Sequence, residues 1–142
     1  MSVSNLTETF RLMGALGHKD ETRPIQTIVI AVQGTLIDYN GQVQTETQKA
    51  ALYFIEQGLN VMLASTSAEK ADRLIQASDV DARIKSLSVA DKVTSYDICE
   101  KSNKGWGVID KDMMGRNAAV LFGADMVFDP KSSKTYGAML TL

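Results

Sequence analysis

The segment Ile28–Asp38, with the sequence IVIAVQGTLID, changes abruptly from a β-branched apolar run into a small polar turn. With the residues just before it, the apolar part predicts a strand over Ile25–Val32 that is buried on both faces. The turn holds Gly34 and Thr35, and glycine allows a backbone N–H to approach an anion closely. We therefore expect a buried strand that leads directly into an anion-binding loop.

Strands and helices alternate along the rest of the chain. Short apolar runs that end at turn residues are predicted as strands, at Leu59–Ala64, Ile84–Val89, Trp106–Asp110, Met126–Phe128 and, at a sheet edge, Tyr136–Leu142. Helices are expected from Thr45 to Gly58, from Thr66 to about Ala77, over Asp91–Lys101 and over Met113–Phe122. This order predicts an α/β protein with a three-layer, Rossmann-like fold, in which a mostly parallel sheet of about five strands has helices on both faces.

Local signals indicate how several of these elements begin. Thr45-Glu46-Thr47-Gln48 and Thr66-Ser67-Ala68-Glu69 have the spacing of capping boxes, in which the first hydroxyl caps a helix. Asn40-Gly41 is a strong hairpin signal, so we expect a small β-excursion over Leu36–Val43 after the first strand.

Length and charge limit the classes of function. The 142 residues are enough for one domain with a substantial core, and the formal net charge of −2 provides no general attraction to nucleic acid. No apolar run reaches the roughly 20 residues that a membrane-spanning helix needs. The chain lacks a secretory signal pattern, which predicts a cytoplasmic protein and leaves signal-independent export open. The single cysteine, Cys99, fits a reducing compartment and is expected in the core rather than as a nucleophile.

Residues 1–24 are predicted to be an amphipathic helix and a linker attached to a domain that spans residues 25–142. Leu6, Phe10, Met13 and Leu16 recur at helical spacing, and a polar stretch follows them. These four side chains are candidates for binding a protein partner, and the alternative is that they pack against the domain itself.

Ligands of parallel sheets bind beyond the carboxyl ends of the strands, which directs attention to the residues there. Ser65 and Thr66 follow the second strand, where their hydroxyls and the helix N–H groups can hold a phosphate oxygen or simply cap the helix. Asp110 and Asp112 follow the fourth strand and can bind Mg²⁺, although Asp112 is equally suited to capping the next helix. Three lysines precede the fourth strand and are candidates to reach the same place: Lys92, Lys101 and Lys104.

In order and spacing, these motifs resemble those of the haloacid dehalogenase-like (HAD) superfamily of phosphatases and phosphotransferases. The first motif of that family is an apolar strand ending in D-x-D-G-T-L, and residues 31–36 of this chain are A-V-Q-G-T-L. Ser65 matches the second motif, a strand that ends in Ser or Thr. Asp110 and Asp112 match the fourth, a strand that ends in aspartates. The third motif, a lone lysine, has no single match, and the resemblance covers about residues 25–130.

Ala31 and Gln33 stand where the family has its two catalytic aspartates. In the family the first aspartate attacks phosphorus and binds the metal, and the second acts as general acid and base. Alanine has no nucleophile, and the glutamine amide has no proton to exchange near neutral pH. The intervals between motifs are also too short for the cap domain of many members. The resemblance therefore implies a degenerate, capless member that needs no cofactor, with Mg²⁺ as the ion that Asp110 and Asp112 would hold weakly.

Two functions of different classes follow from the sequence. The first is a catalytically inactive HAD-like pseudoenzyme that acts as a protein-interaction or structural module. The second is a Mg²⁺-dependent phosphohydrolase in which Asp38, Asp110 and Asp112 support attack by water. A small flavodoxin-like regulatory domain is a third and weaker alternative. The pseudoenzyme is favoured because Asp38 lies in the loop, past the strand end that carries Ala31.

Overall fold

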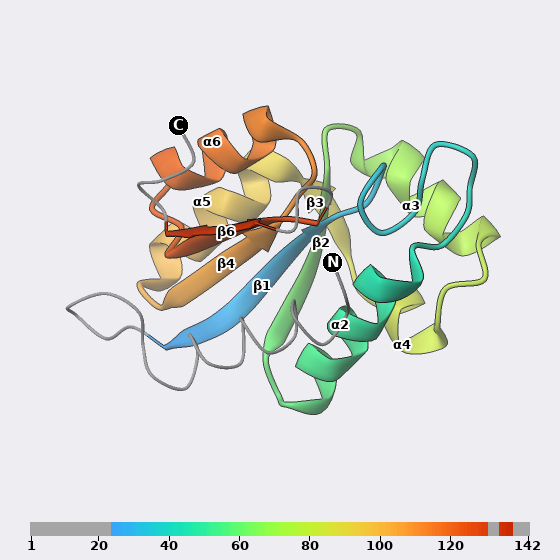
Figure 1. Ribbon diagram of the computed structural model, residues 1–142, viewed down its shortest axis with the longest axis horizontal. Coiled ribbons are helices and arrows are strands. Elements are labelled where there is room, and N and C mark those ends of the chain that lie inside the picture. Colours follow the sequence, from blue (N-terminus) through green and yellow to red (C-terminus); the bar gives the residue numbers. More distant parts are fainter. Residues whose placement is uncertain (1–23, 131–133, 138–142) are drawn as a thin grey trace.

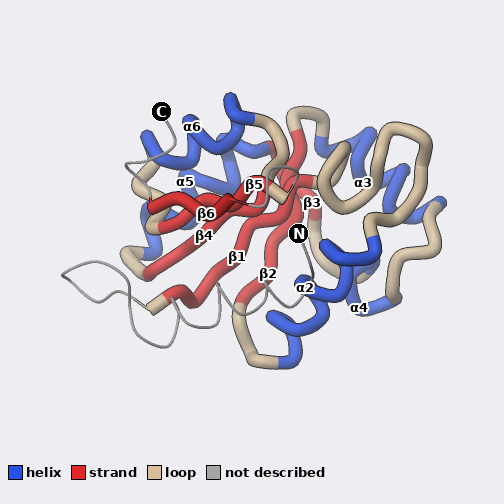
Figure 2. Tube along the Cα trace, in the orientation of Figure 1, coloured by secondary structure: helices blue, strands red, loops and turns tan. Residues whose placement is uncertain are grey.

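A central sheet with helices on both faces is the main feature of the computed structural model, which describes residues 24–130 and 134–137 (Figures 1 and 2). The strands are β1 (Ile25–Ala31), β2 (Asn60–Ser65), β3 (Val89–Asp91), β4 (Gly105–Ile109), β5 (Met126–Asp129) and β6 (Lys134–Gly137). The helices are α2 (Thr45–Glu56), α3 (Ala68–Ala77), α4 (Ala82–Lys85), α5 (Lys92–Ser102) and α6 (Met113–Leu121).

The strand order is β3-β2-β1-β4-β5-β6. β1 to β5 pair in parallel with their neighbours, and β6 pairs antiparallel with β5. Helices on both faces of this sheet confirm the predicted three-layer, Rossmann-like α/β fold.

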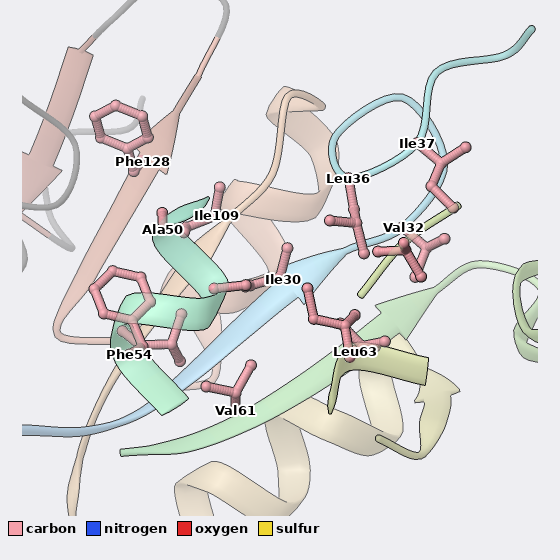
Figure 3. Close-up of a cluster of buried hydrophobic side chains, with 14 of the residues drawn as sticks. Ile30, Val32, Leu36, Ile37, Ala50, Phe54, Val61, Leu63, Ile109 and Phe128 are labelled. Atoms are coloured by element: carbon pink, nitrogen blue, oxygen red, sulfur yellow. The ribbon is translucent and has the colours of Figure 1, made fainter. Parts of the chain in front are cut away.

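β1 lies inside the sheet, and its side chains alternate between the two faces. Ile28 and Ile30 are fully buried on the face covered by α2 and α3, whereas Val29 is buried on the face of α5 and α6. In register, Ile30 lies beside Leu63 of β2 and Ile109 of β4. Figure 3 shows these side chains in one cluster with α2. Burial on both faces explains why the segment is apolar without alternation.

The second face of the sheet is filled by aromatic side chains. Trp106 of β4 and Tyr96 of α5 are both almost fully buried, with ring centroids 5.8 Å apart. Cys99 is buried in the same cluster, and this burial raises the pKa of its thiol to about 11. The thiol is therefore a core group, as expected, rather than a nucleophile.

The predicted strand over Ile84–Val89 is wrong in most of its length. Ile84 lies in the short helix α4, and the strand begins only at Val89, which pairs with Leu63. Val80, Ile84 and Leu87 all pack in the core cluster on the α2 and α3 face, and of the three only Ile84 lies within the helix. The apolar residues of this segment thus reach the core from a short helix and its flanks rather than from a strand.

Both predicted capping boxes are also wrong. The N-cap of α2 is Gln44 and that of α3 is Ser67, and neither side chain makes a capping hydrogen bond. Gln44 is positioned by its own N–H, which donates to the Leu36 carbonyl at 2.8 Å. The hydroxyl that accepts the Ser67 N–H is that of Ser65, at 2.9 Å. Long-range contacts therefore place these helix starts.

The small β-excursion expected after β1 is present as a tight turn at Asn40-Gly41 that is closed by one antiparallel bridge, without longer strands. Ile37 and Val43 form one antiparallel bridge, and Gly41 turns the chain with φ of +83°. The Asp38 carboxylate accepts the N–H groups of Asn40 and Gln42 at 2.9 Å each, which stabilises the turn internally.

Two further predictions concern the two ends of the chain. The edge strand is present as β6, and its predicted part beyond Gly137 lies outside the described residues. Residues 1–23, which include Leu6, Phe10, Met13 and Leu16, also lie outside them. In the part of the chain that the structure describes, no helix has both the length and the hydropathy to cross a bilayer.

Candidate functional site

The carboxyl ends of β1, β2 and β4 meet the first turn of α5 at one edge of the sheet, as the parallel topology requires. We call this region the crest site, which comprises Ala31, Gln33, Ser65, Thr66, Lys92, Asp110 and Asp112. A pocket of about 440 Å³ opens there, and its lining includes Ala31, Gln33, Thr66, Lys70, Lys92 and Asp112. The sequence-predicted residues at three strand ends are therefore brought together.

Gln33 and Ser65 form a direct link between the ends of β1 and β2. The Ser65 hydroxyl lies 2.5 Å from the Gln33 side-chain oxygen and donates to it. The same hydroxyl accepts the Ser67 N–H, and the side chain is only 1% exposed. Ser65 thus acts within the protein as a connector between a strand end, a loop and a helix.

Gly34 and Thr35 use their backbone donors inside the loop. The Gly34 N–H donates to the Ile37 carbonyl at 2.7 Å, and the Thr35 N–H donates to the Val32 carbonyl at 3.2 Å. The Thr35 hydroxyl accepts the N–H of Lys111 at 3.1 Å, which ties this loop to the end of β4. Of the four predicted anion-binding residues, Thr66 is the one that lines the pocket with an exposed side chain.

Asp110 is a fully buried carboxylate that is matched by a lysine. Lys92 Nζ lies 2.7 Å from one carboxylate oxygen, and the other oxygen accepts the Asp112 N–H at 2.9 Å. Burial raises the pKa of Asp110, while the hydrogen bond and charge of Lys92 oppose that rise. The buried Arg116 guanidinium donates to the Asp110 carbonyl at 2.9 Å.

Asp112 is paired with a second lysine. Lys111 Nζ lies 2.7 Å from the Asp112 carboxylate and 4.9 Å from the centre of the Tyr39 ring. The hydrogen bond from Lys111 lowers the pKa of Asp112, and the same bond raises the pKa of Lys111. Asp112 is the N-cap residue of α6 by position, but its side chain makes no capping hydrogen bond.

These ion pairs bear on metal binding. Among the described residues, no group of three or more His, Cys, Asp or Glu side chains is placed to hold a metal ion. Asp110 and Asp112 are neighbours, yet Lys92 lies 2.7 Å from the first and 3.8 Å from the second. An ammonium group therefore supplies the positive charge that a metal ion would otherwise contribute there.

Three features of the crest site were not resolved by the sequence. Of the three candidate lysines, Lys92 reaches the site, whereas Lys101 pairs with Asp97 on the same helix. Lys92 differs from the other two lysines in that it comes immediately after the end of β3, and this position is the signal that could have identified it. Arg116 carries no such signal, and neither does Gly115, where an added Cβ would lie 2.0 Å from the Asp110 carboxylate.

Comparison of the chain with protein-family models, characterised proteins and solved structures found no match. The chemistry of the crest site therefore has to be inferred from its own residues.

Gly115→Ala is expected to destabilise the protein by about 1–3 kcal/mol, because the new methyl group overlaps the Asp110 carboxylate. At an unobstructed position in a helix, Gly→Ala stabilises a protein by up to about 1 kcal/mol. A lower free energy of unfolding in the variant would therefore indicate that the new methyl group is obstructed. Urea denaturation measures the effect, and the matched control is Gly115→Ala in an Asp110→Ala background. Equal costs in the two backgrounds would show that the carboxylate is not the obstacle.

Lys92→Met is expected to destabilise the protein by about 3–5 kcal/mol at pH 8, because it leaves the buried Asp110 charge without its partner. The pKa of Asp110 in the folded protein already lies above its unfolded value and rises further in the variant. Protonation of Asp110 then removes the buried unpaired charge from the variant. The difference in stability between the variant and the native protein should therefore shrink as the pH falls toward about 4. Urea denaturation at several pH values checks this, with Lys101→Met as the exposed control. A loss of stability independent of pH would contradict the assignment.

Proposed function

We propose that this chain is a HAD-like domain without phosphatase chemistry that serves as a protein-interaction module. One observation carries the proposal: the pocket at the end of β1 is lined by Ala31 and Gln33, while the nearby Asp110 is engaged by Lys92. A nucleophilic carboxylate at residue 31 and an acid–base group at residue 33 are what the chemistry of the family requires.

The arrangement of the motifs supports the family part of this proposal. Ser65, Lys92 and the pair Asp110 and Asp112 come from separate segments, and all lie at the carboxyl edge of the sheet near Gln33. Lys92, which lies 2.7 Å from Asp110 at this edge, is our candidate for the lone lysine of the third motif. These positions support a family site in which the reactive side chains at the end of β1 are replaced.

The surroundings of the pocket support the interaction part. Within residues 24–130, the short loop and α2 alone separate β1 from β2, and α3, α4, β3 and α5 alone separate β2 from β4, so neither of these intervals contains an inserted cap. Tyr39 stands at the pocket rim and is 70% exposed. An open, partly aromatic mouth suits contact with another protein better than enclosure of a small substrate.

The alternative function, a Mg²⁺-dependent phosphohydrolase, needs a cation held by Asp38, Asp110 and Asp112. Asp38 lines the pocket, but its carboxylate accepts two N–H groups of its own turn. The two other carboxylates lie against lysines at 2.7 Å. These contacts favour the non-catalytic function.

Hydrolysis of p-nitrophenyl phosphate in the presence of Mg²⁺ is expected to stay at the buffer background, because Ala31 supplies no nucleophile. The control is Asp110→Asn, which should leave the rate at that same background. If the native chain hydrolyses the substrate and Asp110→Asn abolishes that hydrolysis, the phosphohydrolase function would be favoured instead. Turnover gained by Ala31→Asp with Gln33→Asp would support the family assignment.

Affinity purification of the tagged chain from the cells that express it, followed by mass spectrometry, should recover a protein partner bound at the crest site. We expect Tyr39→Ala with Lys70→Glu to reduce recovery of that partner at least tenfold, because both residues line the open pocket. Asn60→Arg, at the opposite end of the sheet, is the matched control and should leave recovery unchanged. Equal recovery with all three proteins would place the contact elsewhere.

A further inference from the structure

One face of α6 is an apolar surface that the described part of the chain leaves uncovered. Met114 and Leu121 are 84% and 86% exposed, and Ala118 lies between them. These residues are spaced by four and three positions, so they form one stripe along the helix. Large apolar side chains gathered in this way on a surface mark a contact site.

The stripe continues into a groove between the first turns of α5 and α6. The groove has a volume of about 540 Å³, and its apolar lining comes from Val93, Tyr96, Met113, Met114 and Ala118. Val93 and Met113 are each more than half exposed at its edge. Methionine side chains adapt readily to an inserted group, so this groove suits a bulky apolar side chain.

We propose that the apolar face of α6 is the surface to which the chain's own amino-terminal segment, residues 6–16, binds. The sequence of that segment has Leu6, Phe10, Met13 and Leu16 at spacings of three and four, which predicts a single apolar helical face. That face has the same periodicity as the α6 stripe, and burial of the two against each other removes both from water. The groove shares Thr66, Lys92 and Asp112 with the crest site, but this inference does not depend on the proposed function of that site.

The place where the described chain begins favours this occupant. Ile25 pairs with Gly105 at the amino end of β4, and α6 ends near the same edge, where the Asp125 N–H donates to the Trp106 carbonyl. Neighbouring strands lie about 5 Å apart and packed layers about 10 Å apart. The seven residues 17–23 can span up to roughly 23 Å, which exceeds the sum of these two spacings.

The direction of the chain then fixes the order of contacts. Leu16, closest to the linker, lies against Leu121, and Phe10 lies one to two turns further along, at the groove beside Met114. The segment runs parallel to α6 toward the linker.

Cross-linking of the full chain tests this arrangement. In a Cys99→Ala background, Leu16→Cys with Leu121→Cys should react rapidly with a short bis-maleimide to give an intramolecular cross-link. The matched control pairs Leu16→Cys with Asp72→Cys, an exposed position on α3 on the opposite face of the sheet. It should cross-link at least roughly tenfold more slowly. Equal rates for the two pairs, or cross-linked dimers in place of monomers, would overturn the proposal.

Amide hydrogen exchange supplies a second test that needs no cysteine. Residues 6–16 should be protected in the native chain, and Met114→Glu with Leu121→Glu should accelerate their exchange on the order of tenfold or more. Both positions are exposed, so the fold should persist, as protection of β1 and β4 will report. Ile98→Glu, exposed on α5 outside the groove, is the control and should leave the exchange unchanged. Unprotected exchange of residues 6–16 in the native chain would overturn the proposal.

Discussion

The burial of β1 on both faces is the constraint on which the rest of the structure depends. Ile28, Val29 and Ile30 contact two separate helical layers, so both layers are assembled around a single strand. Paired with β2 on one side and β4 on the other, β1 also sets the register of the sheet. Because all three strands are parallel, their carboxyl ends are brought to one edge, and the crest site exists only as a consequence of that alignment.

Charge compensation is the second organising feature of the molecule. Asp110 is removed from water entirely, which is tolerated because Lys92 and the Asp112 N–H contact its two oxygens. Gly115 allows the first turn of α6 to pass directly over this carboxylate. Both carboxylates of the crest site, Asp110 and Asp112, are therefore paired with lysine ammonium groups.

Most of the fold could be predicted from the sequence, because buried strands and amphipathic helices each require a characteristic spacing of apolar residues along the chain. The prediction failed at Ile84–Val89, where a short apolar pattern was equally compatible with a helical turn. The prediction also failed at the two capping boxes. The Ser67 N–H donates to the Ser65 hydroxyl, and the Gln44 N–H donates to the Leu36 carbonyl, so neither helix start is fixed by the predicted threonine. In each case the outcome was decided by a contact that local propensity does not contain.

At the candidate site, the sequence determined which chemical groups are present. Ala31 and Gln33 at the end of an apolar strand, and aspartates at the end of another, can be identified without coordinates because strand ends are marked by abrupt changes in polarity. Only the tertiary structure decided which of these groups touch. It selected Lys92 from three lysines, joined Gln33 to Ser65 and buried Asp110 beneath Gly115. The physical reason is that ion pairing and burial depend on distances across the sheet between residues far apart in the chain, whereas periodicity records only what neighbouring residues do.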